Sequence, residues 1–235
     1  MAFKDNDFLK IDYSLWRVAD NQLVRTTEKK LAEENGIFRE DIRYTPQLVV
    51  ISRDNAIKAL WEALKTMDVG ESKTLDLEPK DAFGERNQSL VRMMPIADFR
   101  KRDIDPVPGM QIDIDGVIAT VKSVNSGRVM VDANNPLAGE KVRYEIKVVS
   151  QLVKPEEKVR AVAEMYALEP HAVSVNQAEA RVVFDSKTKM DADYFLNKTY
   201  FVGTVFEYLD EMKKVIVEEE HLKERPAAVE EHHHS

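Results

Sequence analysis

The organisation of the chain depends on residues 141–149, which read Lys141-Val142-Arg143-Tyr144-Glu145-Ile146-Lys147-Val148-Val149. Apolar and polar residues alternate along this stretch, a pattern typical of a strand with one buried face. The same alternation occurs near the N-terminus, over residues 8–16. If these two strands pair, the intervening residues 88–137 form an insertion into the first domain.

Between the two alternating strands, the pattern predicts several shorter elements. Strands are expected at 23–24, 48–51 and 73–77, and a helix that begins near Thr26 is expected to end at Gly36. A second short helix is expected to be capped by Asp54 or Asn55. Apolar residues at helical spacing form its buried stripe: Ile57, Leu60, Trp61, Leu64 and Met67.

Residues 88–137 have a different character, because prolines and glycines divide them into short segments. Strands at 111–115, 117–124 and 128–132 predict a small β-domain. Pro155 then begins a third unit with the order α-β-β-α-β up to residue 224, in which Asp191 or Asp193 caps a long helix. Residues 225–235 are expected to be a disordered tail, and its last histidines resemble an expression tag.

Composition excludes several kinds of chemistry. The 235 residues include no cysteine, all five histidines lie at position 171 or later, and the eight glycines form no phosphate-binding motif. A histidine-based triad or histidine-ligated metal site is therefore impossible in the first 170 residues. A formal charge of −8 argues against nonspecific nucleic-acid binding, and no long apolar run predicts a membrane span or a signal core. We expect a cytoplasmic protein without a metal or cofactor.

Two strings are the most informative motifs: Glu78-Pro79-Lys80-Asp81-Ala82-Phe83-Gly84 and Val131-Asp132-Ala133-Asn134-Asn135-Pro136-Leu137-Ala138-Gly139. The first resembles the Pro-x-x-Ala-Tyr-Gly segment of FKBP-type peptidyl-prolyl isomerases. The second resembles the Val-Asp-Gly-Asn-His-Pro-Leu-Ala-Gly signature of their SlyD-like branch. The similarity extends over residues 6–153, and residues 155–224 are similar to the C-terminal domain of the long archaeal members.

This resemblance implies an α+β fold, in which a half-barrel antiparallel sheet wraps around the short helix at 56–67. Residues 1–87 and 138–153 would form the FKBP-like domain, and 88–137 the insert-in-flap domain that binds unfolded chains as a chaperone. Residues 155–224 would mediate self-association, so a homodimer is an expected state. The expected partners are unfolded or proline-containing polypeptides.

The resemblance also implies an apolar pocket for Xaa-Pro segments, in which the backbone N–H of Ile57 binds a substrate carbonyl and Leu60 forms the floor. The implied pocket residues are Tyr13, Val24, Arg25, Leu48, Ala56, Ile57, Leu60, Phe83 and Tyr144. From composition and spacing alone, ordinary core is the better explanation of the apolar members of this set, and the resemblance reverses that preference.

Four positions depart from the family pattern. Arg25 replaces a pocket aspartate, Phe83 lacks the hydroxyl of a pocket tyrosine, and two glycines beside the helix are Ser52 and Ala59. Each lost hydrogen bond to substrate costs about 0.5–1.5 kcal/mol. We therefore expect reduced isomerase activity, or a folding chaperone or peptide-binding protein that has lost catalysis. Arg25 is equally explained as a solvated surface charge.

The insertion holds a cluster of flexible apolar side chains that suits promiscuous binding. The residues predicted to bind clients are Met93, Met94, Ile96, Phe99, Val107 and Met110. The competing interpretation is a small β-domain that needs methionine to fill gaps in its core.

Overall fold

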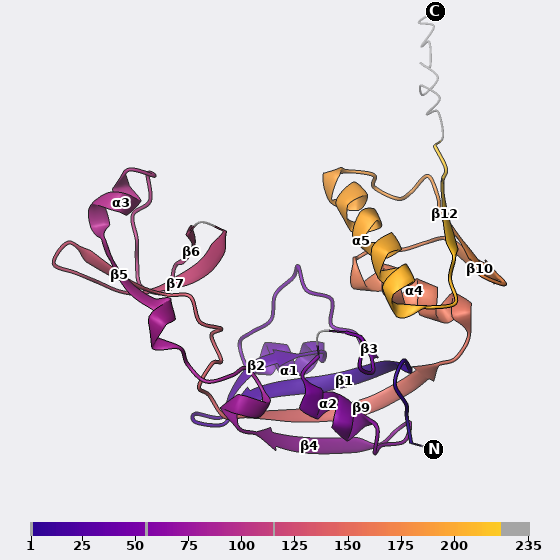
Figure 1. Ribbon diagram of the computed structural model, residues 1–235, viewed down its shortest axis with the longest axis horizontal. Helices are drawn as coiled ribbons and strands as arrows, with labels where there is room; N and C mark the ends of the chain where they lie inside the picture. The colour runs from indigo at the N-terminus through magenta and orange to yellow at the C-terminus, as the bar shows by residue number, and fades with distance from the viewer. Residues whose placement is uncertain (1, 55, 115, 222–235) are drawn as a thin grey trace, which may run out of the picture.

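The computed structural model describes residues 2–54, 56–114 and 116–221 (Figure 1). The tail predicted at 225–235 therefore lies outside the described residues. In Figure 1, a large antiparallel sheet forms the base of the molecule, and two smaller units rise from its ends. This arrangement agrees with the α+β class that the sequence predicts.

The large sheet contains the two alternating strands as neighbours. Its strands are β1 (Phe8–Arg17), β2 (Gln22–Thr26), β3 (Gln47–Val50), β4 (Ser72–Leu77) and β9 (Val142–Leu152). The sheet order is β2-β1-β9-β4, and β3 pairs with the first half of β1. Because β1 and β9 pair along their whole lengths, residues between β4 and β9 leave the sheet and return to it.

Short helices accompany the large sheet: α1 (Lys29–Glu34), α2 (Lys58–Leu64) and the 3-10 turn η1 (Pro79–Asp81). Leu60, Leu64 and Met67 of the predicted stripe are buried against the sheet. The predicted cap of α2 is wrong for Asp54, because the N-cap residue is Ile57 and no side chain caps the helix. The alternative cap, Asn55, lies outside the described residues.

The inserted sheet comprises β5 (Val91–Pro95), β6 (Gln111–Ile114), β7 (Val117–Asn125) and β8 (Arg128–Asp132), in the order β5-β8-β7-β6. The 3-10 turn η2 (Gln88–Leu90) precedes it, and helix α3 (Ile96–Arg100) follows β5. Its buried residues form a cluster of their own around Phe99, Val121 and Val129. The sequence did not predict α3, because five residues are too few to show a helical period.

The C-terminal unit has the predicted order α-β-β-α-β. Its elements are α4 (Pro155–Met165), β10 (Ala172–Asn176), β11 (Glu179–Phe184), α5 (Ala192–Tyr208) and β12 (Lys214–Glu219). β11 pairs with β10 in antiparallel and with β12 in parallel orientation. Asp191 caps α5 by accepting a hydrogen bond from the backbone N–H of Tyr194 at 3.1 Å.

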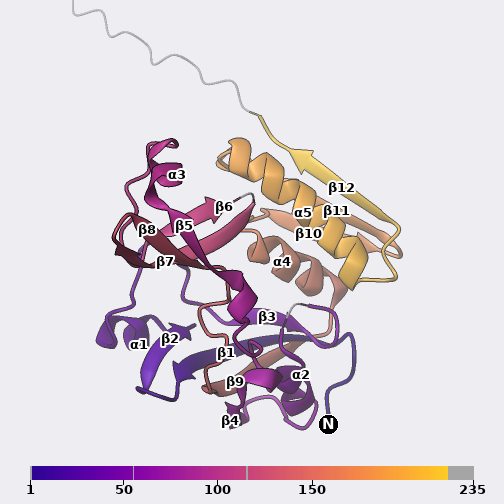
Figure 2. The ribbon, with the colours of Figure 1, turned by 60° about the vertical axis from the view of Figure 1, so that its left-hand side comes forward.

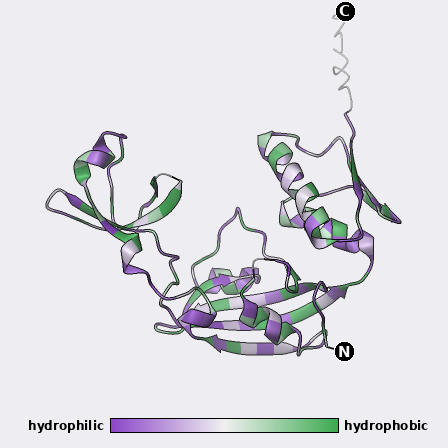
Figure 3. Cartoon of the chain, in the orientation of Figure 1, coloured by the Kyte–Doolittle hydropathy of each residue, from purple (hydrophilic) through white to green (hydrophobic). Residues whose placement is uncertain are grey.

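The C-terminal unit shares a hydrophobic core with one end of the large sheet. Phe8 of β1 and Leu48 and Val50 of β3 are buried in one cluster with residues of α4, β11 and α5. Figure 2 shows α4 above β1 and β3, with α5 farther from the sheet. Figure 3 shows hydrophobic and hydrophilic residues in turn along the strands of the large sheet, consistent with two faces of different surroundings. No helix among the described residues is long and apolar enough to cross a membrane.

Candidate active site

Six of the nine predicted pocket residues lie in one cluster between α2 and the large sheet. They come from β1, β9, the residues before and within α2, and the segment after η1. These residues are Tyr13, Ala56, Ile57, Leu60, Phe83 and Tyr144. Leu60 and Tyr144 are buried, whereas the other four are half-buried. The arrangement is an apolar site with a buried floor and a partly accessible rim.

Tyr13 and Tyr144 lie side by side in surroundings of low polarity. Their ring centroids lie 6.0 Å apart. Burial raises the pKa of the Tyr144 hydroxyl to about 12, and burial also raises the pKa of Tyr13. The nearby charge of Arg25 acts in the opposite direction on both hydroxyls. Arg25 therefore lies close enough to the site to influence its electrostatics. In the pairing of β1 with β2, Arg25 lies opposite buried Leu15.

The segment before α2 is held by a single carboxylate. Asp54 accepts hydrogen bonds from the backbone N–H groups of Val50 and Ala56 and from the indole N–H of Trp61, at 2.8, 3.0 and 2.9 Å. This contact turns Trp61 toward Asp54. Among the described residues, the N–H of Ile57 donates to no acceptor, so it is free to bind a carbonyl group.

The structure does not bring Leu48 and Val24 to this cluster. Leu48 lies on the opposite face of β3 from Val49, in the core shared with the C-terminal unit. Because neighbouring residues of a strand face opposite sides, Leu48 and Val49 cannot both face α2. Val24 lies at the bulge where the register passes from Leu15–Arg25 to Trp16–Leu23. It is 36% exposed and belongs to none of the core clusters among the described residues.

The two signature strings meet beside the site, which the sequence did not reveal. The backbone N–H of Gly139 donates to the carbonyl of Gly84 at 2.8 Å, and Gly84 donates to the carbonyl of Pro79 at 2.7 Å. Gly139 has a φ of 81°, and a Cβ there would lie 3.3 Å from the Cβ of Arg86, so a larger residue at this position would be strained. Leu137 joins the buried residues around α2, although only its position in the signature string indicates a role.

Ser52 and Ala59, the two positions at which the resemblance implies glycine, differ in their backbone surroundings. Ser52 adopts a φ of 63°, in the left-handed region that glycine occupies easily. Its hydroxyl donates to Asp5 at 2.7 Å, which helps to hold this conformation. Ala59 lies inside α2, where alanine is a better helix former than glycine.

The residues predicted to bind clients occupy three environments in the insertion. Phe99 is buried in its core, and Met94, Ile96 and Met110 pack against that core. Met93 and Val107 are each 52% exposed. Sequence reasoning missed two exposed apolar residues of β7, Val117 and Ile118, which follow Gly116 in an alternating strand.

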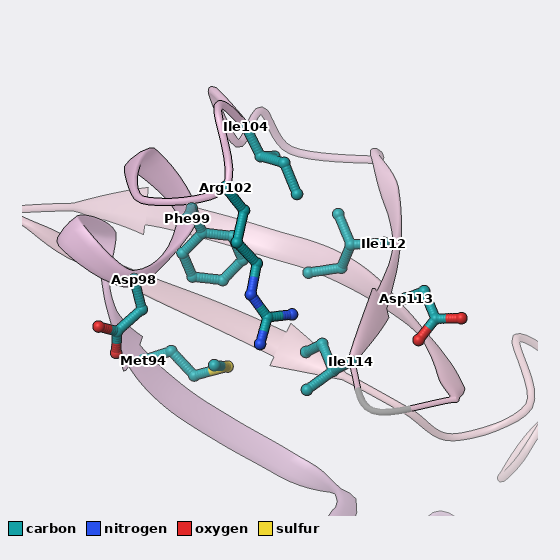
Figure 4. A pocket seen from close by; sticks show the side chains of 8 residues that line it. All are labelled: Met94, Asp98, Phe99, Arg102, Ile104, Ile112, Asp113 and Ile114. Atoms are coloured by element: carbon teal, nitrogen blue, oxygen red, sulfur yellow. The ribbon is translucent and has the colours of Figure 1, made fainter.

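A hollow of about 40 Å³ lies beside Phe99 in the insertion. Figure 4 shows Arg102 between Phe99 on one side and Ile112 and Ile114 on the other. A hollow of that volume has room for only a few water molecules. Within the described part of the chain, no group of three or more histidine, aspartate and glutamate residues is arranged to hold a metal ion.

Comparison with known proteins identifies the class of protein. Residues 2–98 match the family model described as FKBP-type peptidyl-prolyl cis-trans isomerase, and residues 92–137 match the one described as FKBP26, IF domain. The short-type peptidyl-prolyl cis-trans isomerase of Methanocaldococcus jannaschii is 32% identical over 145 residues, which cover 62% of this chain and 91% of that protein. The chain therefore belongs to the FKBP-type peptidyl-prolyl cis-trans isomerase family.

More distant relatives indicate the branch. The FKBP-type peptidyl-prolyl cis-trans isomerase SlyD of Pasteurella multocida is 26% identical over 138 residues, covering 57% of this chain and 69% of the relative. The protein of the same name from Helicobacter pylori is 26% identical over 128 residues, covering 53% and 69%. The chain is thus a SlyD-like FKBP, as the two motif strings predict.

Proposed function

We propose that this chain catalyses cis–trans isomerisation of Xaa-Pro bonds in unfolded or proline-containing polypeptides, at the apolar site between α2 and the large sheet. The observation that supports this most is the joint placement of six apolar or aromatic side chains beside the free N–H of Ile57. The relatives reported above are named as peptidyl-prolyl isomerases.

The chemistry requires no titrating group. Rotation about an amide bond has a barrier of about 18–20 kcal/mol, because resonance is lost in the twisted state. The two Xaa-Pro isomers differ by only about 0.5–1 kcal/mol. A catalyst therefore needs to bind the twisted amide better than either planar form.

An apolar site favours the twisted amide because that form has less charge separation and loses less solvation on burial. The burial of Tyr144, which also raises the pKa of its hydroxyl, supports weak solvation at the floor of the site. In this proposal Leu60 and Tyr144 contact the proline ring, and the N–H of Ile57 holds a flanking carbonyl. Tyr13, Ala56 and Phe83 form the rim.

Two substitutions predict a slow enzyme. Phe83 offers no hydroxyl to the substrate, and Arg25 introduces a positive charge near the two tyrosines. A protease-coupled assay with a short Xaa-Pro peptide tests the proposal on the intact chain. We expect acceleration over the uncatalysed rate, and a further increase in the double variant Arg25→Asp, Phe83→Tyr. A wild-type rate equal to the uncatalysed one would contradict catalysis.

If catalysis is absent, the second proposed function is binding of unfolded chains without isomerisation. Its support is the exposed apolar set on the insertion, Met93, Val107, Val117 and Ile118. Such side chains suit contact with many different apolar segments. Residues 88–137 would then be an insert-in-flap domain between the two parts of the FKBP-like domain, 1–87 and 138–153.

Suppression of aggregation of a reduced, unfolded client tests this second function. The variant Met93→Ser, Ile118→Ser should suppress aggregation less than the wild type does. The control is Val69→Ser, because Val69 is 53% exposed but lies between α2 and β4. Equal suppression by all three proteins would exclude these side chains from client binding.

We also propose self-association through residues 155–224. Phe195, Leu196, Tyr200 and Phe206 of α5 are exposed apolar or aromatic residues, which supports contact with a second copy. Light scattering of the intact chain tests this, and a monomer at high concentration would contradict it.

A further inference from the structure

Arg25 lines a large cleft and also faces the side of the sheet that carries the apolar site. Its partner in the β1–β2 register is Leu15, whose side chain belongs to the core around α2. The side chain of Arg25 is exposed and also lines a cleft of about 1050 Å³ between the segment 41–48 and α4. The same guanidinium is near enough to the two tyrosines of the apolar site for its charge to act on their hydroxyls.

The carboxylates of that cleft are already paired with other cations. Glu164 forms an ion pair with Lys10 at 2.8 Å, and Glu169 pairs with Arg43. The third carboxylate, Asp41, accepts two hydrogen bonds from Arg39 at 3.0 and 2.5 Å. No carboxylate of the cleft is left for Arg25 among the described residues.

The remaining cation of the cleft is also held. The guanidinium of Arg160 donates to the carbonyl of Pro170 at 2.6 Å. Among the residues that the structure describes, Arg25 alone of the charged side chains lining the cleft has neither an ion pair nor a hydrogen bond. The cleft thus presents an unpaired guanidinium whose charge also reaches the two tyrosines of the apolar site.

A free guanidinium next to an apolar surface is suited to one kind of ligand group. Its planar N–H donors match the two oxygens of a carboxylate, and such charge-assisted bonds are stronger than neutral ones. The low-polarity wall formed by Tyr13 and Tyr144 strengthens the interaction compared with bulk water. A lysine or arginine at the same place on a peptide would be repelled.

We propose that Arg25 is a specificity-determining residue that selects Xaa-Pro segments with an aspartate or glutamate next to the proline. The carboxylate of the peptide completes the pairing that Arg25 lacks within the chain. This inference rests on the proposed function of the apolar site. It concerns which proline segments bind there, and it holds for binding with or without isomerisation.

The test uses the intact chain and two pairs of short peptides. Each pair differs only by glutamate against glutamine, placed just before the proline in one pair and just after it in the other. Because the two residues have the same shape, the comparison isolates the charge. Affinity is measured by fluorescence anisotropy, and kcat/KM by exchange between the cis and trans peptide signals.

We expect the wild type to prefer glutamate in at least one pair by about fivefold, the size of a partly exposed ion pair. The preference should weaken at high salt, vanish in Arg25→Gln and reverse in Arg25→Glu. The control is Lys147→Ala, an exposed cation on the opposite face of β9 from Tyr144, which should keep the preference.

Equal affinity for glutamate and glutamine in both pairs would overturn the inference, as would a preference that persists in Arg25→Gln. Failure of the proposed catalysis has a different signature, because no peptide would then exchange faster than it does without protein. In that case the affinity ratio still decides whether Arg25 selects acidic segments.

Discussion

The inserted sheet and the C-terminal unit are attached to the large sheet in opposite ways. The insertion has its own core of residues 94–133, whereas the C-terminal unit shares a core with β1 and β3. Both units follow a strand of the large sheet in the chain, β4 and β9 respectively. Two units that each follow a strand of the same sheet can therefore differ in whether they share a hydrophobic core with it. What decides this is whether apolar side chains of the sheet face the added unit.

Polar contacts fix the insertion where its chain leaves and re-enters the large sheet. Asp132 is 3% exposed, pairs with Arg86 and accepts two bonds from Asn134 at 3.0 and 2.7 Å. Asn134 in turn exchanges hydrogen bonds of 2.8 and 2.9 Å with the backbone of Asn87. This junction orients the insertion without a shared apolar core, so its geometry depends on directional bonds.

The largest loss of unfolding free energy is expected from Phe8→Ala, which removes a fully buried ring from the shared core. Phe8 is 1% exposed and contacts Tyr208 edge to face, with ring centroids 6.4 Å apart. Such a truncation costs about 3–5 kcal/mol of unfolding free energy. Denaturant unfolding followed by far-UV circular dichroism measures the loss.

The control for Phe8→Ala is Met165→Ala, because Met165 lies on α4 of the C-terminal unit but is 44% exposed. It should change the free energy of unfolding by no more than about 0.5 kcal/mol. Equal losses from the two variants would show that the shared core does not couple the C-terminal unit to the sheet.

A smaller loss of unfolding free energy is expected from Asp132→Ala, at the point where the insertion joins the large sheet. Leaving the partners of a buried carboxylate unsatisfied costs about 1–3 kcal/mol. Hydrogen exchange should rise in β5–β8 and in residues 132–139, with little change in β1 and β9. A uniform rise over the whole chain would contradict the separate core of the insertion.

The same aspartate predicts an acid dependence. Burial alone would raise the pKa of Asp132, but hydrogen bonds from Asn134 and the charges of Arg86 and Lys122 outweigh it and leave the pKa below its usual value. A lowered folded-state pKa stabilises the fold above the unfolded value of about 3.9, and this contribution is lost as the pH falls through the folded value. Asp132→Asn should lack that part of the acid dependence of stability.

The smallest effect is expected where polar contacts bridge the large sheet and the C-terminal unit. Lys10 and Glu164 pair at 2.8 Å across this boundary, with both side chains partly exposed. A double-mutant cycle with Lys10→Met and Glu164→Gln should give a coupling of about 0.2–1 kcal/mol that falls with salt. A coupling as large as the Phe8→Ala loss would mean that ion pairs, rather than the shared core, join the two units.

Much of the fold could be predicted from the sequence because its strands alternate cleanly. The alternation of β1 and β9 indicated their pairing, and the sheet of β5–β8 lies between β4 and β9 in the chain. The cap of α2 could not be predicted, because Asp54 bonds to Val50, Ala56 and Trp61 rather than to the helix. Those partners lie together only after folding.

Ile57, Leu60 and Phe83, which the family resemblance implied as pocket residues, lie together in the cluster between α2 and the large sheet. Leu48 illustrates the limit, because a run of four apolar residues gives no indication of which face each one takes. The environment of Arg25 was likewise hidden, since it depends on how Asp41, Glu164 and Glu169 pair in space.

The most direct test of the central claim is amide chemical-shift mapping of the intact chain during titration with a short Xaa-Pro peptide. The proposed site predicts that the largest changes occur at Ile57, Leu60, Phe83 and Tyr144, with the N–H of Ile57 shifting as it gains a carbonyl acceptor. Changes confined to the insertion or to the C-terminal unit, with Ile57 and Phe83 unmoved at saturation, would contradict a proline site between α2 and the large sheet.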